Sequence, residues 1–175
     1  MSRIRLATPL DRHGIRAVHR AAFPESEREK IAGLALALLE WESTPPTISL
    51  VAEAGGEVIG HVAFSPVSLD HREDWSGYIL APLAVTPAHH GKGLGTALVE
   101  SGIRQLAGAD VLFVYGDPDY YGRFGFDAAT AATYQPPHVL EYPFGWQALK
   151  LGSRRQAAAQ GALRCVEPLD DPALW

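Results

Sequence analysis

The segment from Leu83 to Leu98, LAVTPAHHGKGLGTAL, constrains the fold of this chain more than any other. A short apolar run is followed by a proline bend, and glycines at 91, 93 and 95 then open a segment with helical apolar spacing. The first amides of a helix lack intrahelical partners, and the helix dipole favours anions there. Glycines let a phosphate approach the backbone closely. The segment therefore predicts a strand–loop–helix unit suited to a phosphorylated ligand.

Glycine spacing alone leaves the ligand open. A Walker loop needs Ser or Thr after the lysine, whereas Lys92 precedes Gly93. A dinucleotide fingerprint needs G-x-G-x-x-G and an acidic residue about 20 positions further on, where this chain has Val111 and Leu112. A turn that binds no ligand fits the spacing as well.

The flanking residues narrow the choice. Leu83-Ala84-Val85, Pro87 and the run His90–Gly95 resemble the acyl-coenzyme A loop of the GNAT N-acetyltransferase family. His90 stands where that family usually has Gln or Arg, while Gly93 and Gly95 match its pattern. The resemblance implies that backbone amides hold the pyrophosphate. The His90 side chain adds a shorter, titratable donor.

Three further blocks carry the same resemblance. Gly116–Phe126, GDPDYYGRFGF, is similar to the family's aromatic-rich helix that ends in Gly-Phe, in the form found in its YhbS-type branch. Gly60-His61 with Phe64–Val67, and Ala81–Val85, fit that branch too. The four blocks occur in the family's order over about residues 48 to 127, whereas the ends of the chain resemble it less.

The apolar pattern predicts one α/β domain over residues 1–175. Strands are expected at 4–7, 48–53, 57–64, 78–85, 111–115, 144–151 and 162–166, with a Gly55-Gly56 hairpin turn. Helices are expected after Asp11, after a Ser26/Glu29 capping box, and from 94 to 106. Residues 154–161 are expected to form a surface turn or short helix. A strand–helix–strand crossover predicts that 78–85 and 111–115 are parallel neighbours.

The resemblance implies how such a fold works. It implies a mixed central sheet with helices on both faces and a splayed parallel strand pair that admits the thioester. The expected acetyl-CoA contacts are Tyr121 and the strand and loop residues Leu83, Ala84, Val85, His90, Gly91, Lys92, Gly93, Leu94, Gly95 and Thr96. A backbone amide near Leu83 would stabilise the oxyanion while an amine attacks directly.

Two side chains are candidates for catalysis. Tyr121 matches the family's tyrosine five residues before Phe126 and is expected to protonate the leaving thiolate. His61 could relay a proton from the amine through water, although a core histidine is the plainer interpretation. Asp117 is expected to cap the helix that follows it, and Arg123 could meet the cofactor or an acidic neighbour.

Composition narrows the partners. A net charge of −5 argues against general nucleic-acid binding, and no His/Cys/Asp/Glu cluster has metal-ligand spacing. A single cysteine, Cys165, and the lack of a signal peptide or an apolar run of about 20 residues predict a cytoplasmic protein away from membranes. The expected partners are acetyl-CoA and a primary amine on a small molecule or a protein, and a homodimer is left open. A non-catalytic acyl-CoA sensor and a nucleotide-binding module are the alternatives.

Overall fold

Two compact units make up the structure, a computed structural model that describes residues 1–152 and 159–175. The first unit comprises Met1–Phe64 and Ala81–Arg104, and the second comprises Ser65–Leu80 and Gln105–Trp175. Strands β3 (Glu57–Leu69) and β4 (Gly77–Val85) each contribute residues to both units. Each unit is therefore assembled from separate stretches of sequence. One domain over 1–175 stays a prediction.

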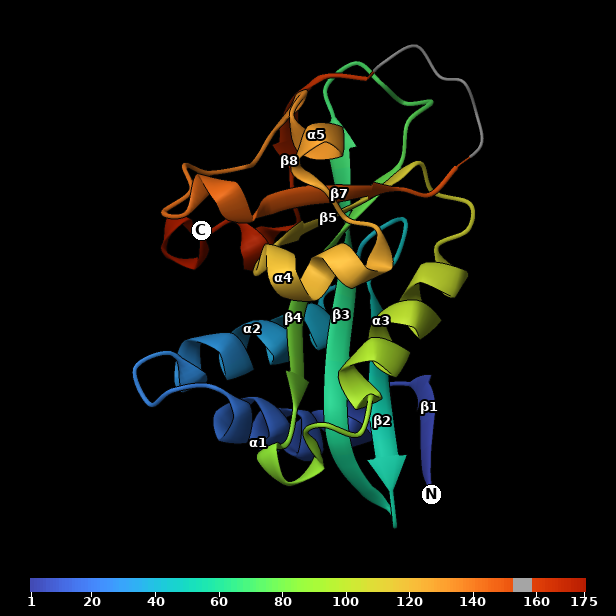
Figure 1. Cartoon of the computed structure of the whole chain (residues 1–175), viewed down its shortest axis with the longest axis vertical. Helices are drawn as coiled ribbons and strands as arrows, with labels where there is room; N and C mark the ends of the chain where they lie inside the picture. Colours follow the sequence, from blue (N-terminus) through green and yellow to red (C-terminus); the bar gives the residue numbers. More distant parts are fainter. Residues whose placement is uncertain (153–158) are drawn as a thin grey trace. The chain divides into compact units, whose positions relative to one another are not determined.

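The first unit is a sheet with helices on both faces (Figure 1). Strands β1 (Ser2–Leu6), β2 (Ile48–Ala54) and β3 are antiparallel neighbours, and β4 follows β3. The helices are α1 (Arg12–Ala22), α2 (Arg28–Glu40) and α3 (Leu94–Gln105), with short 3-10 turns at Pro9–Asp11 and Pro87–His89. The expected Gly55-Gly56 turn joins β2 to β3, and both glycines have positive φ, 60° and 83°.

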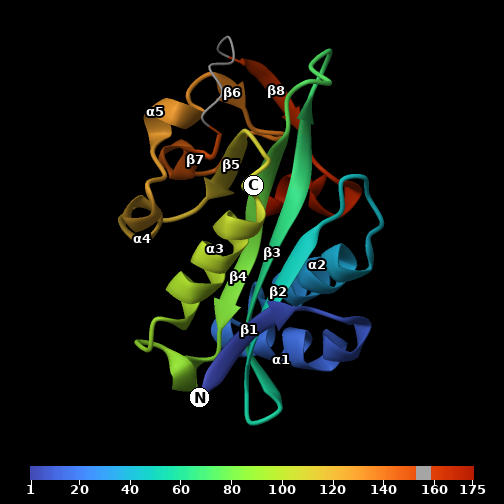
Figure 2. The ribbon, with the colours of Figure 1, turned by 90° about the vertical axis from the view of Figure 1, so that its right-hand side faces the viewer.

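Alternation along β3 decides which helix each side chain meets. Phe64 lies against Gly102 of α3, and Gly60 lies close to Leu98 of the same helix. His61 points to the opposite face of the strand and contacts His19 of α1. Since neighbouring strand residues point to opposite faces, α3 covers one face of this unit and α1 the other, as Figure 2 shows. The predicted helices on both faces are confirmed here.

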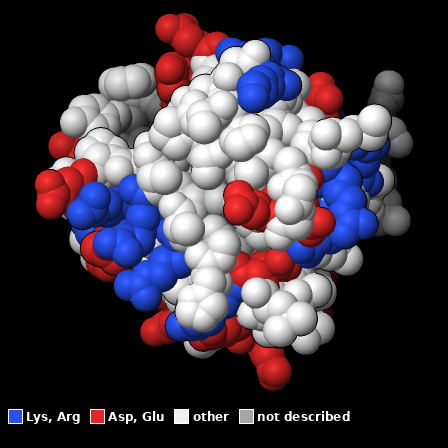
Figure 3. All heavy atoms as spheres, turned by 90° about the horizontal axis from the view of Figure 1, so that it is seen from below, with Lys and Arg blue, Asp and Glu red and all other residues white. Residues whose placement is uncertain are grey.

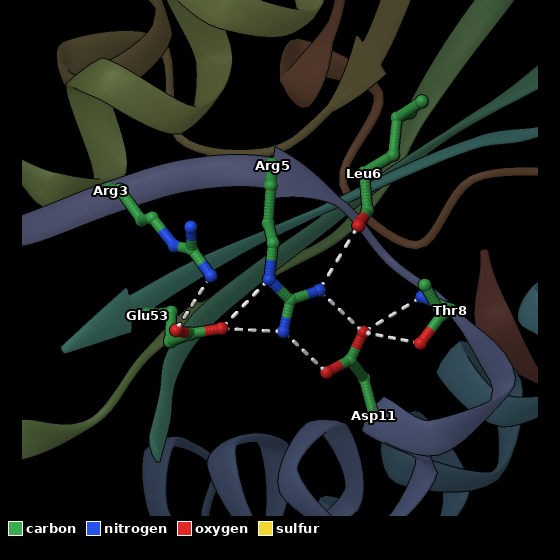
Figure 4. Close-up of polar contacts among 6 residues, drawn as sticks. All are labelled: Arg3, Arg5, Leu6, Thr8, Asp11 and Glu53. Atoms are coloured by element: carbon green, nitrogen blue, oxygen red, sulfur yellow. Dashed lines mark hydrogen bonds and ion pairs between the residues drawn. The ribbon is translucent and has the colours of Figure 1, made fainter. Parts of the chain in front are cut away.

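An ion-pair network fastens β1 to its neighbours (Figure 4). Both terminal nitrogens of Arg5 donate to the Asp11 carboxylate at 2.8 Å, and its Nε donates to Glu53 at 2.8 Å. The Thr8 amide also donates to Asp11 at 2.7 Å, and Arg3 donates to Glu53. Asp11 is therefore committed to Arg5 and Thr8. It lies at the N-cap of α1, as expected, but its side chain makes no capping hydrogen bond there.

We expect Asp11→Asn to destabilise the protein by about 2 kcal/mol at neutral pH. The Arg5 hydrogen bonds lower the pKa of the buried Asp11 carboxyl to about 2, from an ordinary 3.8. A lowered folded-state pKa stabilises the fold above about pH 4, and this stabilisation is lost as the pH falls towards 2. Urea unfolding at pH 7 and pH 3 should show the difference between variant and wild type shrinking with acid. Asp70→Asn, which breaks an exposed pair with Arg164, is the control and should cost less than about 0.5 kcal/mol.

The predicted Ser26/Glu29 capping box is wrong. Helix α2 begins at Arg28 with Glu27 at its N-cap, and no side chain caps it. Glu29 instead pairs with Arg20 at 2.7 Å and Arg16 at 3.5 Å, both on α1. A carboxylate near two guanidinium groups gains more from them than from one local backbone amide, which explains the difference.

The second unit contains strands of both directions. The first residues of β4 pair in parallel with β5 (Val111–Tyr115), from Gly77↔Val111 to Leu80↔Val114, which confirms the predicted parallel neighbours. Strand β7 (Trp146–Lys150) is antiparallel to β5, and β8 (Gly161–Arg164) pairs with β6 (Tyr134–Gln135) and with the end of β3. The helical segments are α4 (Pro118–Tyr121), α5 (Ala128–Ala131) and 3-10 turns at Gly122–Phe124, Pro143–Gly145, Glu167–Leu169 and Pro172–Leu174.

Aromatic packing forms the core of this unit. Phe113 stacks on Trp146 with ring centroids 5.2 Å apart and meets Tyr134 edge-on at 4.9 Å. Trp75 packs against both Phe113 and Tyr134. Trp75 and Trp146 are both buried. These tryptophans are therefore core residues.

Some element bounds differ from expectation. β3 continues past Phe64 to Leu69, because its last residues pair with β8. The strand expected at 144–151 begins only at Trp146, after a 3-10 turn that Pro143 opens. The turn or short helix expected at 154–161 falls mostly on residues 153–158, outside the described part of the chain. Within the described residues, no helix is both long and apolar enough to cross a membrane.

Candidate functional site

The glycine loop has the geometry that its sequence predicts. After β4, the turn Pro87–His89 leads to Gly91 and Gly93, whose φ angles are +73° and +75°. These left-handed conformations favour glycine strongly, because a side chain there would strain the backbone. Helix α3 then begins at Leu94, and its first hydrogen bond runs from the Ala97 amide to the Gly93 carbonyl. The preceding amides at the start of the helix are the kind that hold an anion.

Histidine side chains hold this loop in place. His90 Nε2 donates to the Val85 carbonyl at 2.7 Å and ties the loop to the end of β4. His89 Nδ1 lies 2.9 Å from the Thr86 hydroxyl, and the Thr86 amide donates to the Ile59 carbonyl of β3. The His90 side chain therefore serves the loop's own structure. Lys92 is exposed beside it.

The last residues of β4, Ala81–Val85, are partly exposed. Burial alternates along this stretch: Pro82 and Ala84 are buried, whereas Ala81, Leu83 and Val85 are partly exposed. Pairing with β5 ends at Leu80, so β4 runs on beyond its parallel partner. A strand segment of this kind offers backbone groups to an extended ligand.

Tyr121 ends α4 in the second unit and is held by aromatic rings. It meets Tyr120 edge-on at 5.0 Å and Phe126 at 5.8 Å. A Cβ on Gly116 would lie 2.5 Å from the Tyr121 ring, so only glycine allows this packing. Desolvation raises the pKa of the phenol above its ordinary 10, with smaller contributions from Tyr120 and Asp117. Tyr121 is therefore a protonated phenol at neutral pH.

The side chains of Asp117 and Arg123 stabilise the helical segment that carries Tyr121. The Asp117 carboxylate accepts a hydrogen bond from the Asp119 amide at 2.9 Å, which confirms the predicted cap of α4. Arg123 donates to the Tyr120 carbonyl, and its guanidinium lies 4.4 Å from the centre of the Tyr120 ring. Both contacts fix the helical segment that carries Tyr121.

His61 is a fully buried residue of the first unit. Its Nδ1 lies 2.8 Å from Nε2 of His19, which is also fully buried. Desolvation lowers the pKa of both imidazoles, that of His19 to about 4 and that of His61 well below its usual 6.5. Both rings are therefore neutral at pH 7.

Sequence reasoning missed His19, although a signal was present. His19 lies four residues after Ile15 and one after Val18, and so falls on the apolar stripe of α1. A polar residue on such a stripe needs a buried partner. The stripe of α1 therefore indicates a buried polar partner for His19 on another element.

Other groups make weaker candidates. Burial raises the pKa of the Cys165 thiol to about 11, so this thiol is unreactive at neutral pH. Among the described residues, no group of three or more His, Cys, Asp or Glu side chains could hold a metal ion. On the face drawn in Figure 3, basic side chains gather at separate places with acidic ones beside them.

Comparison with known proteins identifies the family. The model of the acetyltransferase (GNAT) family matches residues 12–126, which include both the glycine loop and Tyr121. The chain belongs to the GNAT acetyltransferase family. It is accordingly an acyltransferase of the acetyl-CoA-dependent type.

Relatives extend the likeness along the chain. The N-acetyltransferase YjhQ of Escherichia coli is 35% identical over 170 residues, covering 94% of this chain and 92% of the relative. The N-acetyltransferase YhbS of E. coli is 42% identical over 130 residues, covering 72% and 74%. The expected YhbS-like branch is thus confirmed.

Solved structures confirm the α/β fold class. The crystal structure of E. coli YhbS in complex with CoA aligns with a TM-score of 0.84 at 31% identity, covering 97% of this chain and 92% of that one. A GNAT acetyltransferase from Brucella melitensis in complex with acetyl-CoA aligns with a TM-score of 0.75 at 34% identity, covering 97% and 99%.

Proposed function

We propose that this protein transfers an acetyl group from acetyl-CoA directly to a primary amine, with no covalent enzyme intermediate. The proposal rests mainly on the loop before α3, in which Gly91 and Gly93 adopt left-handed conformations. The chain that contains this loop belongs to the acetyltransferase family. The complexes of the related structures with CoA and acetyl-CoA support the same cofactor. The acceptor is an amine of a small molecule or a protein.

The proposed cofactor site is built mainly from backbone. The amides of Gly91, Gly93 and the first turn of α3 would hold the pyrophosphate, with His90, Lys92, Gly95 and Thr96 around it. Leu83, Ala84 and Val85 would pair with the pantetheine amides as an added strand does. A backbone amide near Leu83 would then donate to the oxyanion of the tetrahedral intermediate.

Two side chains would move protons. The amine nitrogen attacks the thioester carbonyl, the carbon–sulfur bond breaks, and Tyr121 gives its phenolic proton to the departing thiolate. The acceptor nitrogen loses its proton through water to His61. His61 then releases its proton to solvent and solvent returns a proton to Tyr121, so the products are the acetylated amine and CoA.

We expect CoA to stabilise the wild-type protein against heat more than ATP or NAD does. Free CoA at 100 times its dissociation constant would add about 3 kcal/mol, which raises the melting temperature by several degrees. In Gly93→Val a left-handed backbone must carry a branched side chain, and the CoA effect should largely disappear.

Thermal melts with each ligand, and with no ligand, check this expectation. Equal protection by ATP or NAD would favour a nucleotide-binding module and contradict the cofactor assignment. Protection by CoA without product from any amine would identify a non-catalytic acyl-CoA-binding protein. Acetyl-CoA with a panel of primary amines, followed by release of the free thiol, separates these outcomes.

A further inference from the structure

A pair of buried histidines in the first unit has more polar atoms than hydrogen bonds. His19 and His61 are both 0% exposed, and one contact of 2.8 Å joins Nε2 of His19 to Nδ1 of His61. The rings meet edge-on with centroids 5.1 Å apart. Within the described residues, the outer nitrogens, Nδ1 of His19 and Nε2 of His61, are buried with no hydrogen-bond partner.

Two neutral imidazoles can share only one hydrogen bond between these atoms. One ring donates its N–H and the other accepts, so the pair is left with one unpaired N–H and one unpaired lone pair. Each such buried group costs about 1–3 kcal/mol, and apolar residues of similar shape would avoid this cost. A polar pair with this cost is more common at functional sites than in ordinary cores.

The charges around the pair are neutralised. Asp11 is the charged group that acts on His61, and its carboxylate is held by Arg5. On α1, Arg16 and Arg20 pair with Glu29 of α2. The aromatic ring of Phe23 stacks near His19 at 6.0 Å. Desolvation lowers the pKa of His61 by more than Asp11 raises it, and His19 is the group that contacts the inner nitrogen of His61.

The pair lies next to the strand that would carry the thioester. His61 belongs to β3, the neighbour of β4 in the sheet. The bond from the Thr86 amide to the Ile59 carbonyl, 2.9 Å long, fixes the end of β4 beside β3 two residues from His61. The proposed function assigns Leu83, Ala84 and Val85 of this β4 segment to the pantetheine arm.

We propose that His19 is a positioning residue for acetyl transfer, because its Nε2 accepts Nδ1–H of His61 and thereby leaves the lone pair on Nε2 of His61. This inference rests on the proposed function and adds a residue to it. With Nδ1 occupied, Nε2 is the one ring atom of His61 that can take up a proton. Because Nε2 of His61 is buried, the proton would reach it from the acceptor nitrogen through an internal water bound to this unpaired atom, and it would return to solvent after the thiolate has been protonated.

Replacing each histidine by Asn or Gln tests its two ring nitrogens separately, because the amide takes the place of one nitrogen and leaves the other without a substitute. In His61→Asn the amide can replace Nδ1 and keep the bond to His19, but no atom replaces Nε2. In His19→Gln the amide reaches the position of Nε2 and can still accept from His61, whereas His19→Leu cannot. Ile15→Val, at a buried position of the same helix, is a matched control that weakens packing without touching the pair.

We expect His61→Asn and His19→Leu to lower kcat with acetyl-CoA and the best amine of the panel by about 10-fold or more. KM for acetyl-CoA should stay within about twofold, His19→Gln should restore most of kcat, and Ile15→Val should keep the wild-type pH profile. Nitrogen-15 NMR of the histidine rings should show His61 of the wild type with its proton on Nδ1. In His19→Leu this proton should no longer be fixed on Nδ1.

Several results would overturn the role of His19. They are a wild-type His61 with its proton on Nε2, a folded His19→Leu variant with unchanged kcat, or a His19→Gln variant that is as slow as His19→Leu. If His19→Leu does not fold, His61→Asn and the wild-type NMR spectrum still decide. A wild-type protein that acetylates no amine would contradict the proposed function instead. The NMR spectrum would then still show whether His19 holds the proton of His61 on Nδ1.

Discussion

Replacing Tyr121 by Phe should slow acetyl transfer by about 100-fold, the size of effect typical of losing a general acid. The phenol hydroxyl is the only group removed, and the ring contacts with Tyr120 and Phe126 remain. KM for acetyl-CoA should change little, because the loop at Gly91 and Gly93 is unaltered. A steady-state assay of thiol release, with binding of CoA measured separately, checks the expectation.

The matched control for this change is Tyr120→Phe. Tyr120 is the neighbouring tyrosine and supports Arg123 through its ring and carbonyl. It should retain activity within about threefold of wild type, since its hydroxyl has no role in the proposed transfer. A Tyr121→Phe enzyme as fast as wild type would remove Tyr121 from the role of acid. Because burial raises the pKa of Tyr121 above 10, its deprotonation should not limit kcat between pH 7 and 9.

Replacing Gly102 by Ala should destabilise the fold by about 2 kcal/mol or more, although alanine is the better helix former. A Cβ at this position of α3 would lie 2.0 Å from Cζ and 2.1 Å from Cε2 of Phe64. Phe64 is 0% exposed in β3, so its ring cannot turn away without displacing other core residues. Helix and strand must therefore move apart.

Gly33→Ala is the matched control, because Gly33 also lies inside a helix, α2. A Cβ there meets nothing within 4 Å, and the residue is exposed. The variant should gain about 1 kcal/mol from reduced freedom of the unfolded chain. Urea unfolding of the two variants should thus give shifts of opposite sign. Shifts of the same sign would mean that the contact between Gly102 and Phe64 does not limit the packing of α3.

The sequence predicted the parts of the fold that local rules decide. Glycines with positive φ at 55, 56, 91 and 93 follow from turn chemistry, and the order of strands and helices follows from apolar spacing. The parallel pairing of β4 with β5 follows from the crossover rule. These features need little knowledge of distant residues.

Other features depend on partners far away in the sequence. Glu29 was expected to cap a helix locally, but two arginines of α1 bind it. His61 was recognised, whereas its partner 42 residues earlier was not, since the apolar stripe of α1 indicates that His19 is buried but does not say which strand residue it contacts. The tertiary pairing of charged and polar groups was thus the least predictable part of the candidate site.

The way both units draw on separated stretches of sequence also bears on how the chain is made. When Phe64 leaves the ribosome, the first unit still lacks Ala81–Val85 and almost all of α3, the helix whose Gly102 receives the Phe64 ring. The nascent chain must therefore keep one face of β3 uncovered while at least 38 further residues, up to Gly102, are synthesised (102 − 64 = 38). At about 5–20 residues per second, this takes some seconds, during which the apolar residues on that face of β3 are exposed to aggregation.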